Sequence, residues 1–374
     1  MNTSRLMIVI AAGILLVAGG YYGYTQLFAP TPETSSTPPT TVVQTPPQTL
    51  SSTREVVATG LDTPWTIAFL PSGEMLVSER KGTIRVLGKT PRSIQVPGVI
   101  ETGEGGLTGL ALHPQFATNQ FLYAYFTVKG DGEDINRVVR YRFDGYTLAE
   151  PVIIIDAIPA GANHNGGQIA FGPDAKLYVC TGDAGTSSFA QDKNSLAGKI
   201  LRVNDDGSIP SDNPFGTAVF SYGHRNPQGI AWDDKGRLWA TEHGRSGLST
   251  GYDELNLIES GQNYGWPTIQ GPATQLGLRS PVAQSGSVTT WAPAGIIYKD
   301  GSLYFTGLRG QSLYSVSLTS SGQSEKITSY FKEEYGRLRA VTLGPDGAIY
   351  FSTSNKDGRG TVTAGDDKII RWIP

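Results

Sequence analysis

The sequence predicts an all-β protein, a six-bladed β-propeller whose blades are four-stranded antiparallel sheets. An apolar run, a turn rich in Pro, Asp or Gly, and a second apolar run rich in Tyr, Val and Phe recur six times, and this pattern is typical of an antiparallel hairpin. The copies recur at intervals of about 45 to 65 residues, which indicates radial repetition with one blade per copy. The 47 glycines and 23 prolines supply the turns of such a closed fold.

The six predicted hairpins follow one another along the chain, and polar residues flank each of them. In chain order they are TPWTIAFLPSGEMLVSER from Thr63, GLTGLALHPQFATNQFLYAYFT from Gly106, HNGGQIAFGPDAKLYVCTGDAG from His164, HRNPQGIAWDDKGRLWATEHG from His224, WAPAGIIYKDGSLYFTGLRG from Trp291 and GRLRAVTLGPDGAIYFSTSN from Gly336. Residues just before the first strand and just after the second lie at the same end of a hairpin. In a propeller all six such ends face one rim, so we expect the functional site there.

The N-terminal region is predicted to lie outside the propeller. Arg5 precedes an uncharged apolar stretch from Leu6 to about Tyr24, close to the length that spans a bilayer. Residues 1–28 are therefore predicted to be a signal anchor or a signal peptide, and residues 29–53, rich in Pro, Thr and Ser, a disordered linker. Residues 54–374 then form the propeller. The length of the apolar stretch favours an uncleaved membrane anchor with an exported, extracytoplasmic catalytic domain.

The net charge and the cysteine content limit the classes of partner and site that the sequence allows. The net charge is −3 and charged residues make up 17% of the chain, so no basic field is present to recruit nucleic acid. The single cysteine, Cys180, lies in an apolar run and is expected to fill the core. The sequence leaves a monomer and a homodimer both open.

Histidines gather on the predicted rim. Of the four, at positions 113, 164, 224 and 243, only His113 falls on the turn side, where we expect a structural role. His164 and Asp183 occupy matching ends of one hairpin, so the carboxylate is placed to fix the tautomer of an imidazole base. The alternative is a His–Asp pair that only satisfies the polar ends of a blade.

Arginines gather there too, at positions 225, 309, 337 and 339, and Asn226 and Gln228 accompany the first of them. Guanidinium groups that face one channel repel one another unless an anion lies between them, and their planar geometry suits a carboxylate or a phosphate. We therefore expect a polyanionic ligand. The alternative, which we expect for at least one arginine, is pairing with an acid of a neighbouring blade.

A loop from Glu242 to Pro267 offers oxygen ligands. Its Gly- and Ser-rich backbone leaves carbonyl groups available, and Asp253 and Glu254 add carboxylates, so the loop could hold Ca²⁺. A surface loop with solvated acids explains the same composition.

Taken together, these segments resemble the glucose/sorbosone dehydrogenase family, the soluble quinoprotein sugar dehydrogenases that bind pyrroloquinoline quinone (PQQ). The resemblance runs from Leu61 to the C-terminus. Within the family, the chain is most similar to the aldose sugar dehydrogenase branch. It is carried by motifs that recur in order: GLTGLALHPQF, HNGGQIAFGPDAKLY, TGDAG, AGKILRVNDDGSIPSDNPF, YGHRNPQGIAW, DELNLIESGQNYGWP and GRLRAV.

The resemblance implies oxidation of an aldose sugar at C1 to the lactone, with transfer of electrons to an external acceptor, a quinone or a redox protein. His164 would remove the proton of the anomeric hydroxyl while hydride passes to PQQ, and Asp183 would orient His164. Arg225 and Asn226 would contact the quinone, with Gln228 in support. The arginines that would bind the PQQ carboxylates are Arg337 and Arg339.

The resemblance also implies calcium. The backbone carbonyls of Gly244 and Arg245 would hold the Ca²⁺ that polarises the quinone, and Glu254 and Tyr264 match positions of a second, structural calcium. Two residues depart from the family pattern among the implied cofactor contacts: Arg309 replaces a lysine, and Glu104 replaces a glutamine, so that its charge could oppose a carboxylate of the cofactor. A non-catalytic exported binding module and a calcium-dependent sugar lactonase are the alternative functions.

Overall fold

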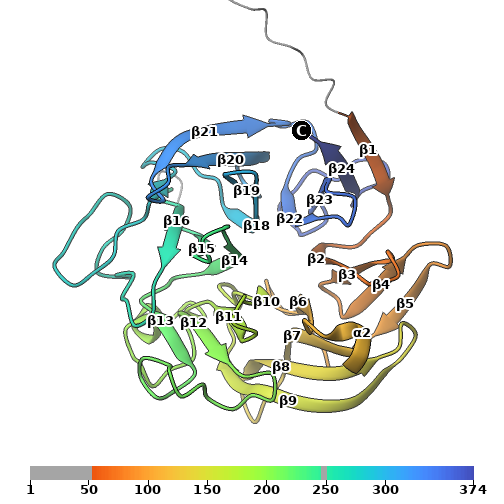
Figure 1. Ribbon diagram of the computed structural model, residues 1–374, viewed down its shortest axis with the longest axis horizontal. Coiled ribbons are helices and arrows are strands. Elements are labelled where there is room, and N and C mark those ends of the chain that lie inside the picture. The colour runs from red at the N-terminus through yellow and green to blue at the C-terminus, as the bar shows by residue number, and fades with distance from the viewer. Residues whose placement is uncertain (1–52, 246–250) are drawn as a thin grey trace, which may run out of the picture. The chain divides into compact units, whose positions relative to one another are not determined.

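The computed structural model describes residues 53–245 and 251–374, which form six four-stranded antiparallel sheets arranged around a central axis (Figure 1). The predicted all-β, six-bladed propeller is thereby confirmed. The predicted apolar N-terminal helix and all but the last residue of the predicted linker lie outside the described residues. None of the helices in the described ranges has the length and apolar character that crossing a bilayer requires.

Five blades each take four consecutive strands, and Figure 1 places the first strand of each blade nearest the axis. These blades are β2 (Pro64–Phe69), β3 (Met75–Glu79), β4 (Thr83–Leu87) and β5 (Arg92–Gln95); β6 (Leu107–Leu112), β7 (Phe121–Lys129), β8 (Asp134–Phe143) and β9 (Leu148–Pro159); β10 (Ile169–Phe171), β11 (Leu177–Thr181), β12 (Lys199–Val203) and β13 (Val219–Tyr222); β14 (Pro227–Trp232), β15 (Leu238–Glu242), β16 (Glu254–Ile258) and β17 (Ala283–Gln284); and β18 (Pro293–Lys299), β19 (Ser302–Gly307), β20 (Ser312–Leu318) and β21 (Ser324–Tyr330). The short helix α2 (Phe116–Asn119) joins β6 to β7, and a 3₁₀ helix (Ser187–Ala190) lies between β11 and β12.

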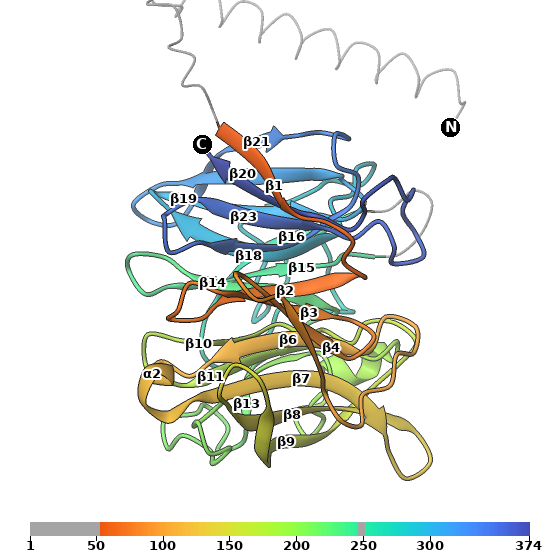
Figure 2. The same cartoon turned by 90° about the vertical axis from the view of Figure 1, so that its right-hand side faces the viewer.

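The last blade closes the ring with strands from both ends of the propeller. It contains β22 (Leu338–Leu343), β23 (Ile349–Thr353) and β24 (Ile369–Ile373), and β1 (Thr53–Ala58) pairs with β24 as its outermost strand (Figure 2). Pairing an N-terminal with a C-terminal strand in one sheet holds the first and last blades together and leaves no open gap in the ring.

The six hairpins predicted from the sequence are the first two strands of the six blades, from β2–β3 to β22–β23. Glycines in these inner strands follow from how closely neighbouring blades approach. A Cβ atom on Gly109 of β6 would lie 2.2 Å from the carbonyl oxygen of Gly167, and one on Gly229 of β14 would lie 2.3 Å from that of Ala294. Glycine is therefore required where backbones of adjacent blades meet.

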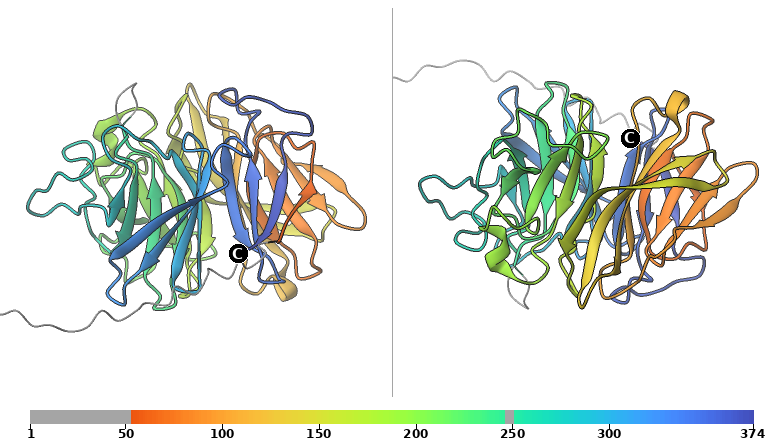
Figure 3. Two further views of the ribbon diagram at one scale, coloured as in Figure 1. Left: turned by 90° about the horizontal axis from the view of Figure 1, so that it is seen from above. Right: turned by 90° about the horizontal axis from the view of Figure 1, so that it is seen from below.

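Apolar side chains fill the spaces between adjacent blades. One such cluster contains Leu76 and Ile84 of one blade and Leu107, Leu122 and Phe126 of the next, all of them buried. Seen edge-on, the strands of all blades end at two faces, where the connecting loops gather (Figure 3). The core thus holds the loop ends of six blades in fixed relative positions.

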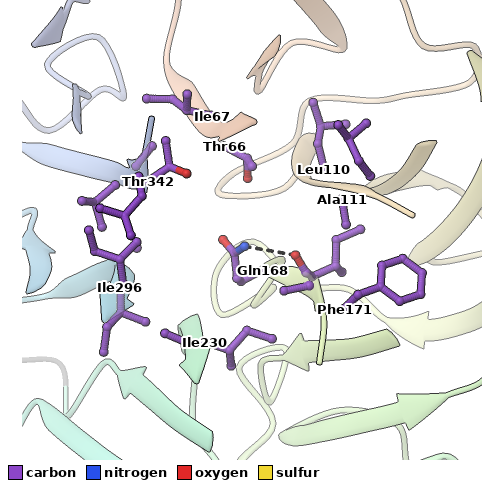
Figure 4. A pocket seen from close by; sticks show the side chains of 18 of the residues that line it. Thr66, Ile67, Leu110, Ala111, Gln168, Phe171, Ile230, Ile296 and Thr342 are labelled. Atoms are coloured by element: carbon purple, nitrogen blue, oxygen red, sulfur yellow. Dashed lines mark hydrogen bonds between the residues drawn. The ribbon is translucent and has the colours of Figure 1, made fainter. Parts of the chain in front are cut away.

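A central channel of about 550 Å³ runs between the inner strands. Most of its lining side chains are apolar, with Ile67, Leu110, Ile230 and Ile296 among them, and the amide of Gln168 donates a 3.1 Å hydrogen bond to the carbonyl of Ile169 (Figure 4). This part of the axis offers few polar side chains for chemistry.

Candidate active site

A second cavity, of about 380 Å³, lies among the hairpin ends that the sequence predicts to converge. Trp65 lines both this cavity and the central channel. Most of the predicted site residues line it: Glu104, His164, Arg225, Gln228, Gly244, Arg245, Arg309, Arg337 and Arg339. The rim predicted from hairpin geometry therefore gathers these side chains around one space.

His164 and Asp183 form a close pair at the ends of the hairpin β10–β11. The ring nitrogen Nδ1 of His164 lies 2.7 Å from Oδ1 of Asp183, and this oxygen also accepts a 2.8 Å hydrogen bond from the backbone N–H of Gly185. The other oxygen, Oδ2, accepts the indole N–H of Trp266 at 2.8 Å. With Nδ1 occupied, Nε2 is the nitrogen of His164 left for a ligand in the cavity.

The carboxylate of Asp183 is ionised in this setting. Burial opposes ionisation, but the hydrogen bond and charge of His164, with the bonds from Gly185 and Trp266, outweigh it and lower the pKa of Asp183. An ionised carboxylate favours the tautomer of His164 with the proton on Nδ1, which makes Nε2 a proton acceptor.

Two arginines of the last blade share one buried acid. Arg337 pairs with Asp357 at 2.7 Å, and Arg339 lies 3.7 Å from the same carboxylate oxygen. Burial lowers the pKa of Arg339 to about 10, against the opposing charge of Asp357. The guanidinium of Arg339 also donates to Gln228 at 3.1 Å and lies 5.6 Å from the ring of Trp65. Arg337 and Arg339 thus pair with an acid, but this acid belongs to their own blade, whereas an acid of a neighbouring blade was expected from the sequence.

Arg225, just before β14, is held by residues at the end of β15 in the same hairpin, as hairpin geometry predicts. Its backbone N–H donates to the carboxylate of Glu242, and its side chain donates to the carbonyl of His243 at 3.4 Å. The guanidinium lies 5.3 Å from the ring of Trp266, so this indole contacts both Arg225 and Asp183. Burial lowers the pKa of Arg225.

Asn226 does not line the cavity. It is fully buried, and its Oδ1 accepts a 3.0 Å hydrogen bond from the backbone N–H of Gly166, beside His164. Within the described part of the chain its Nδ2 has no partner. The structure thus places Asn226 behind the loop of His164, with one amide group unsatisfied.

The two other rim histidines differ from each other. His224 is fully buried, with its two ring nitrogens 2.8 Å from Glu242 and 2.8 Å from Ser221, so it is a satisfied structural residue. His243 lines the cavity, and in the described ranges its Nε2 has no partner. Burial lowers the pKa of His243 to about 4, which keeps the imidazole neutral near pH 7.

The residues implied as calcium ligands all line one small cavity beside the larger one. About 10 Å³ of space there is bordered by Gly244, Arg245, Glu254 and Tyr264, and the first two also line the larger cavity. Burial and the nearby charge of Glu242 raise the pKa of Glu254 to about 8. In residues 53–245 and 251–374, no group of three or more His, Cys, Asp or Glu side chains is arranged to hold a metal ion.

Asp253, the other acid of this loop, is fully engaged by the protein. Its carboxylate accepts hydrogen bonds from the backbone N–H groups of Gly244, Trp291 and Ala292 and from the hydroxyl of Thr290, all at 2.7–2.9 Å. Asp253 therefore organises the loop around Gly244 and has little capacity left for a metal ion.

Sequence reasoning missed three groups that shape the cavity: Trp266, Asp357 and Arg359. The first two hold Asp183 and the arginines, and Arg359 lines the cavity and pairs with Glu104. Asp357 and Arg359 follow the hairpin end FSTSN by only a few residues, which is the one sequence signal that pointed to this rim. His113, by contrast, packs against Phe121 and Phe171 away from the cavity, as expected of a structural residue.

Comparisons with known proteins agree with this architecture. The aldose sugar dehydrogenase YliI of Escherichia coli is 31% identical over 81% of this chain and 90% of its own length. A structure of the PQQ-bound form of aldose sugar dehydrogenase from Streptomyces coelicolor is 44% identical, covers 86% of this chain and 98% of its own, and superposes with a TM-score of 0.78. An oxidoreductase of Thermus thermophilus described as a glucose dehydrogenase is 42% identical, covers 86% of this chain and all of its own (100%), and has a TM-score of 0.82. The family model of Glucose / Sorbosone dehydrogenase matches residues 61–364. The chain belongs to the glucose/sorbosone dehydrogenase family.

Proposed function

We propose that this protein is a PQQ-dependent aldose sugar dehydrogenase, which oxidises the sugar at C1 to the lactone and passes the electrons to an external acceptor. Family membership and the likeness to a PQQ-bound aldose sugar dehydrogenase support an oxidoreductase that acts on sugars. The observation that carries the proposal is the oriented pair of His164 and Asp183 at the edge of an arginine-lined cavity.

The cavity residues fit a tricarboxylate quinone. Among the described residues, six arginines line the cavity: Arg225, Arg245, Arg309, Arg337, Arg339 and Arg359. The acids there are fewer, namely Glu104 and Asp253 in the lining and Asp357 beside it, so an excess of positive charge remains for an anionic ligand. The unpartnered Nε2 of His243 offers a further polar contact at the cavity wall. Burial strengthens each of these contacts because little water competes for them.

In the proposed mechanism, Nε2 of His164 takes the proton of the C1 hydroxyl while the C1 hydrogen leaves as hydride. When bound, PQQ supplies the electrophilic carbon that accepts this hydride. Asp183 holds the proton on Nδ1 and stabilises the imidazolium that forms, and Trp266 and the backbone of Gly185 keep the carboxylate in place. The sugar thereby loses one proton and one hydride and becomes the lactone.

We propose two Ca²⁺ ions, one held by the backbone carbonyl groups of Gly244 and Arg245 and a second, structural one at Glu254 and Tyr264; all four residues line the same small cavity. The support for the second ion is the carboxyl of Glu254. Burial and, after it, the charge of Glu242 raise the pKa of Glu254, and a bound divalent cation would offset both effects. The side-chain hydroxyl of Tyr264 already contacts the carbonyl of Leu257 and the N–H of Glu259, so Tyr264 would contribute its backbone carbonyl.

The two alternative functions explain fewer features of this cavity. A non-catalytic binding module has no use for an imidazole whose tautomer is fixed by a buried acid. A sugar lactonase has no use for several arginines around one cavity. The proposal also includes membrane attachment through the N-terminal segment, export of the propeller, and a quinone or redox protein as electron acceptor.

Reconstitution tests the proposed function. Purified protein would be freed of cofactor, supplied with PQQ and Ca²⁺ and assayed with a panel of aldoses and a dye acceptor. We expect PQQ-dependent dye reduction, with stoichiometric lactone as product. Dye reduction that needs no PQQ, or its absence with every aldose, would refute the proposal.

A further inference from the structure

Glu104 and Arg359 form an ion pair at the wall of the arginine-lined cavity. Glu104 lies in the loop before β6, and Arg359 lies in the loop between β23 and β24, 255 residues away in sequence. Both side chains line the cavity, with 20% of the Glu104 side chain and 59% of the Arg359 side chain exposed. The pair therefore connects loops of two different blades at the place where an anionic cofactor would bind.

The second oxygen of Glu104 holds the backbone of His164. Oε2 accepts the N–H of His164 at 3.0 Å, and the N–H of Glu104 donates to the carbonyl of Ala162 at 2.9 Å. His164 has a φ of 59°, in the left-handed region that residues other than glycine seldom adopt. Contacts from a neighbouring loop are needed to maintain such a conformation, so Glu104 is a positioning residue for His164.

The charge of Glu104 is a disadvantage for the proposed cofactor. Burial opposes its ionisation, but the hydrogen bond and charge of Arg359, with the N–H of His164, outweigh burial and lower the pKa of Glu104. Glu104 is therefore charged at any working pH. A carboxylate at the cavity wall repels a tricarboxylate unless a cation compensates it, and Arg359 is that cation.

The ion pair adds little to folding. Solvent screens a pair of which one partner is exposed, and two long side chains lose freedom on pairing, so this class of pair contributes little to stability. A guanidinium with more than half of its surface exposed belongs to this class. We expect the ion pair to affect ligand binding in the cavity, and we expect variants of either residue to fold.

We propose that Arg359 promotes binding of the anionic cofactor by neutralising Glu104, which is thereby able to position His164 without repelling the cofactor. The proposal rests on the proposed function. It differs from a direct contact between Arg359 and the cofactor in one respect. Under neutralisation, the carboxylate of Glu104 holds the guanidinium at the cavity wall, so with an uncharged residue 104 the exposed Arg359 is screened by solvent and its removal has little effect.

A double-mutant cycle separates these two roles. Wild type, Glu104→Gln, Arg359→Gln and the double variant would be titrated with PQQ in the presence of Ca²⁺, and binding would be followed by quenching of tryptophan fluorescence. Arg359→Gln should weaken PQQ binding roughly tenfold or more, the effect of one uncompensated charge. Glu104→Gln should bind PQQ at least as tightly as wild type, and the double variant should recover to within about threefold.

The outcomes are distinct. An equal loss from Arg359→Gln in both backgrounds would mean direct contact and would overturn the proposal, and so would the absence of any loss. If wild type itself does not bind PQQ, the proposed function fails instead. Arg137→Gln is the matched control, because it breaks an ion pair with Asp156 (2.9 Å) on β8 and β9, with neither residue lining the cavity.

The positioning role has its own readout. Glu104→Leu keeps the size of the side chain but loses the acceptor for the N–H of His164, whereas Glu104→Gln keeps an acceptor oxygen. We expect the Leu variant to lower kcat roughly tenfold with little change in KM, and the Gln variant to restore kcat, because misplacement of a base affects the reacting state more than binding. Equal kcat values for the two variants would exclude the positioning role.

Discussion

The substitution Asp183→Asn tests how the orientation of His164 contributes to turnover. Asp183 accepts hydrogen bonds from Nδ1 of His164 (2.7 Å), the N–H of Gly185 (2.8 Å) and the indole N–H of Trp266 (2.8 Å). Asparagine has an NH₂ group where aspartate has one of its two oxygens. In either orientation of the amide, this NH₂ donor faces another N–H donor. With NH₂ toward Trp266, His164 keeps its tautomer. With NH₂ toward His164, Nδ1 must accept, and the proton moves to Nε2, which can no longer act as a base.

The magnitude follows from these two orientations. Each sacrifices one buried hydrogen bond at a cost of about 1–3 kcal/mol, so neither is strongly preferred, and we expect the variant to lose stability by about that amount. A fraction of molecules retains the productive tautomer of His164. The loss in kcat should therefore be smaller than that of His164→Ala, for which roughly 10²–10⁴-fold is typical of a missing proton transfer.

The assay is kcat of PQQ-saturated protein at saturating dye, measured for His164→Ala, Asp183→Asn and the double variant. The double variant should match His164→Ala, because Asp183 acts only through His164. Asp156→Asn, on the outer strand β9, is the control. Wild-type kcat in His164→Ala, or losses that multiply in the double variant, would refute the proposed base and its orienting acid.

Three further predictions concern the cofactor, the metal and the N-terminus. The variant Arg337→Ala/Arg339→Ala should bind PQQ roughly 10²–10⁴-fold more weakly in a fluorescence titration, since each charge-assisted contact contributes about 1.5–3 kcal/mol. This variant should also carry Asp357→Asn, because the two substitutions would otherwise leave Asp357 buried without a cation. Arg142→Ala, at an exposed arginine of β8 that does not line the cavity, is its control. Unchanged PQQ affinity would contradict the assignment. Exhaustive EDTA treatment should abolish turnover and lower Tm, because a metal bound only by the folded state stabilises it, and no change in either would exclude the calcium sites. Full-length protein should sediment with membranes and a chain that begins near Ser52 should stay in solution with equal activity, whereas a mature protein found free with its first residue beyond position 24 would indicate a cleaved signal.

The sequence was sufficient to predict what depends on local pattern. Strand periodicity and turn residues identified the six inner hairpins, and hairpin geometry alone placed His164 next to Asp183. By contrast, β1 carries no such pattern, because TREVVA is an exposed outer strand whose partner lies at the other end of the propeller. Its position follows only from closure of the ring.

Contacts between blades could not be predicted in this way. Glu104 stood out as a charge that opposes the cofactor, and only the structure shows that Arg359 compensates it from another blade. Asp357 is likewise a loop residue without a repeat signal, yet it pairs with two arginines of its own blade. The first pair depends on how loops of different blades meet at the rim and the second on how one loop folds back over its own blade, and no periodicity encodes either.

The most direct test of the central claim is a single-turnover measurement of cofactor reduction. PQQ-reconstituted protein would be mixed with an aldose in a stopped-flow instrument without acceptor, and absorbance of the quinone would be followed with hydrogen or deuterium at C1. We expect that the sugar reduces the bound quinone, that deuterium slows this step, and that His164→Ala slows it at least about 10²-fold. A bound quinone that no aldose reduces, or a His164→Ala protein that reduces it at the wild-type rate, would contradict the account.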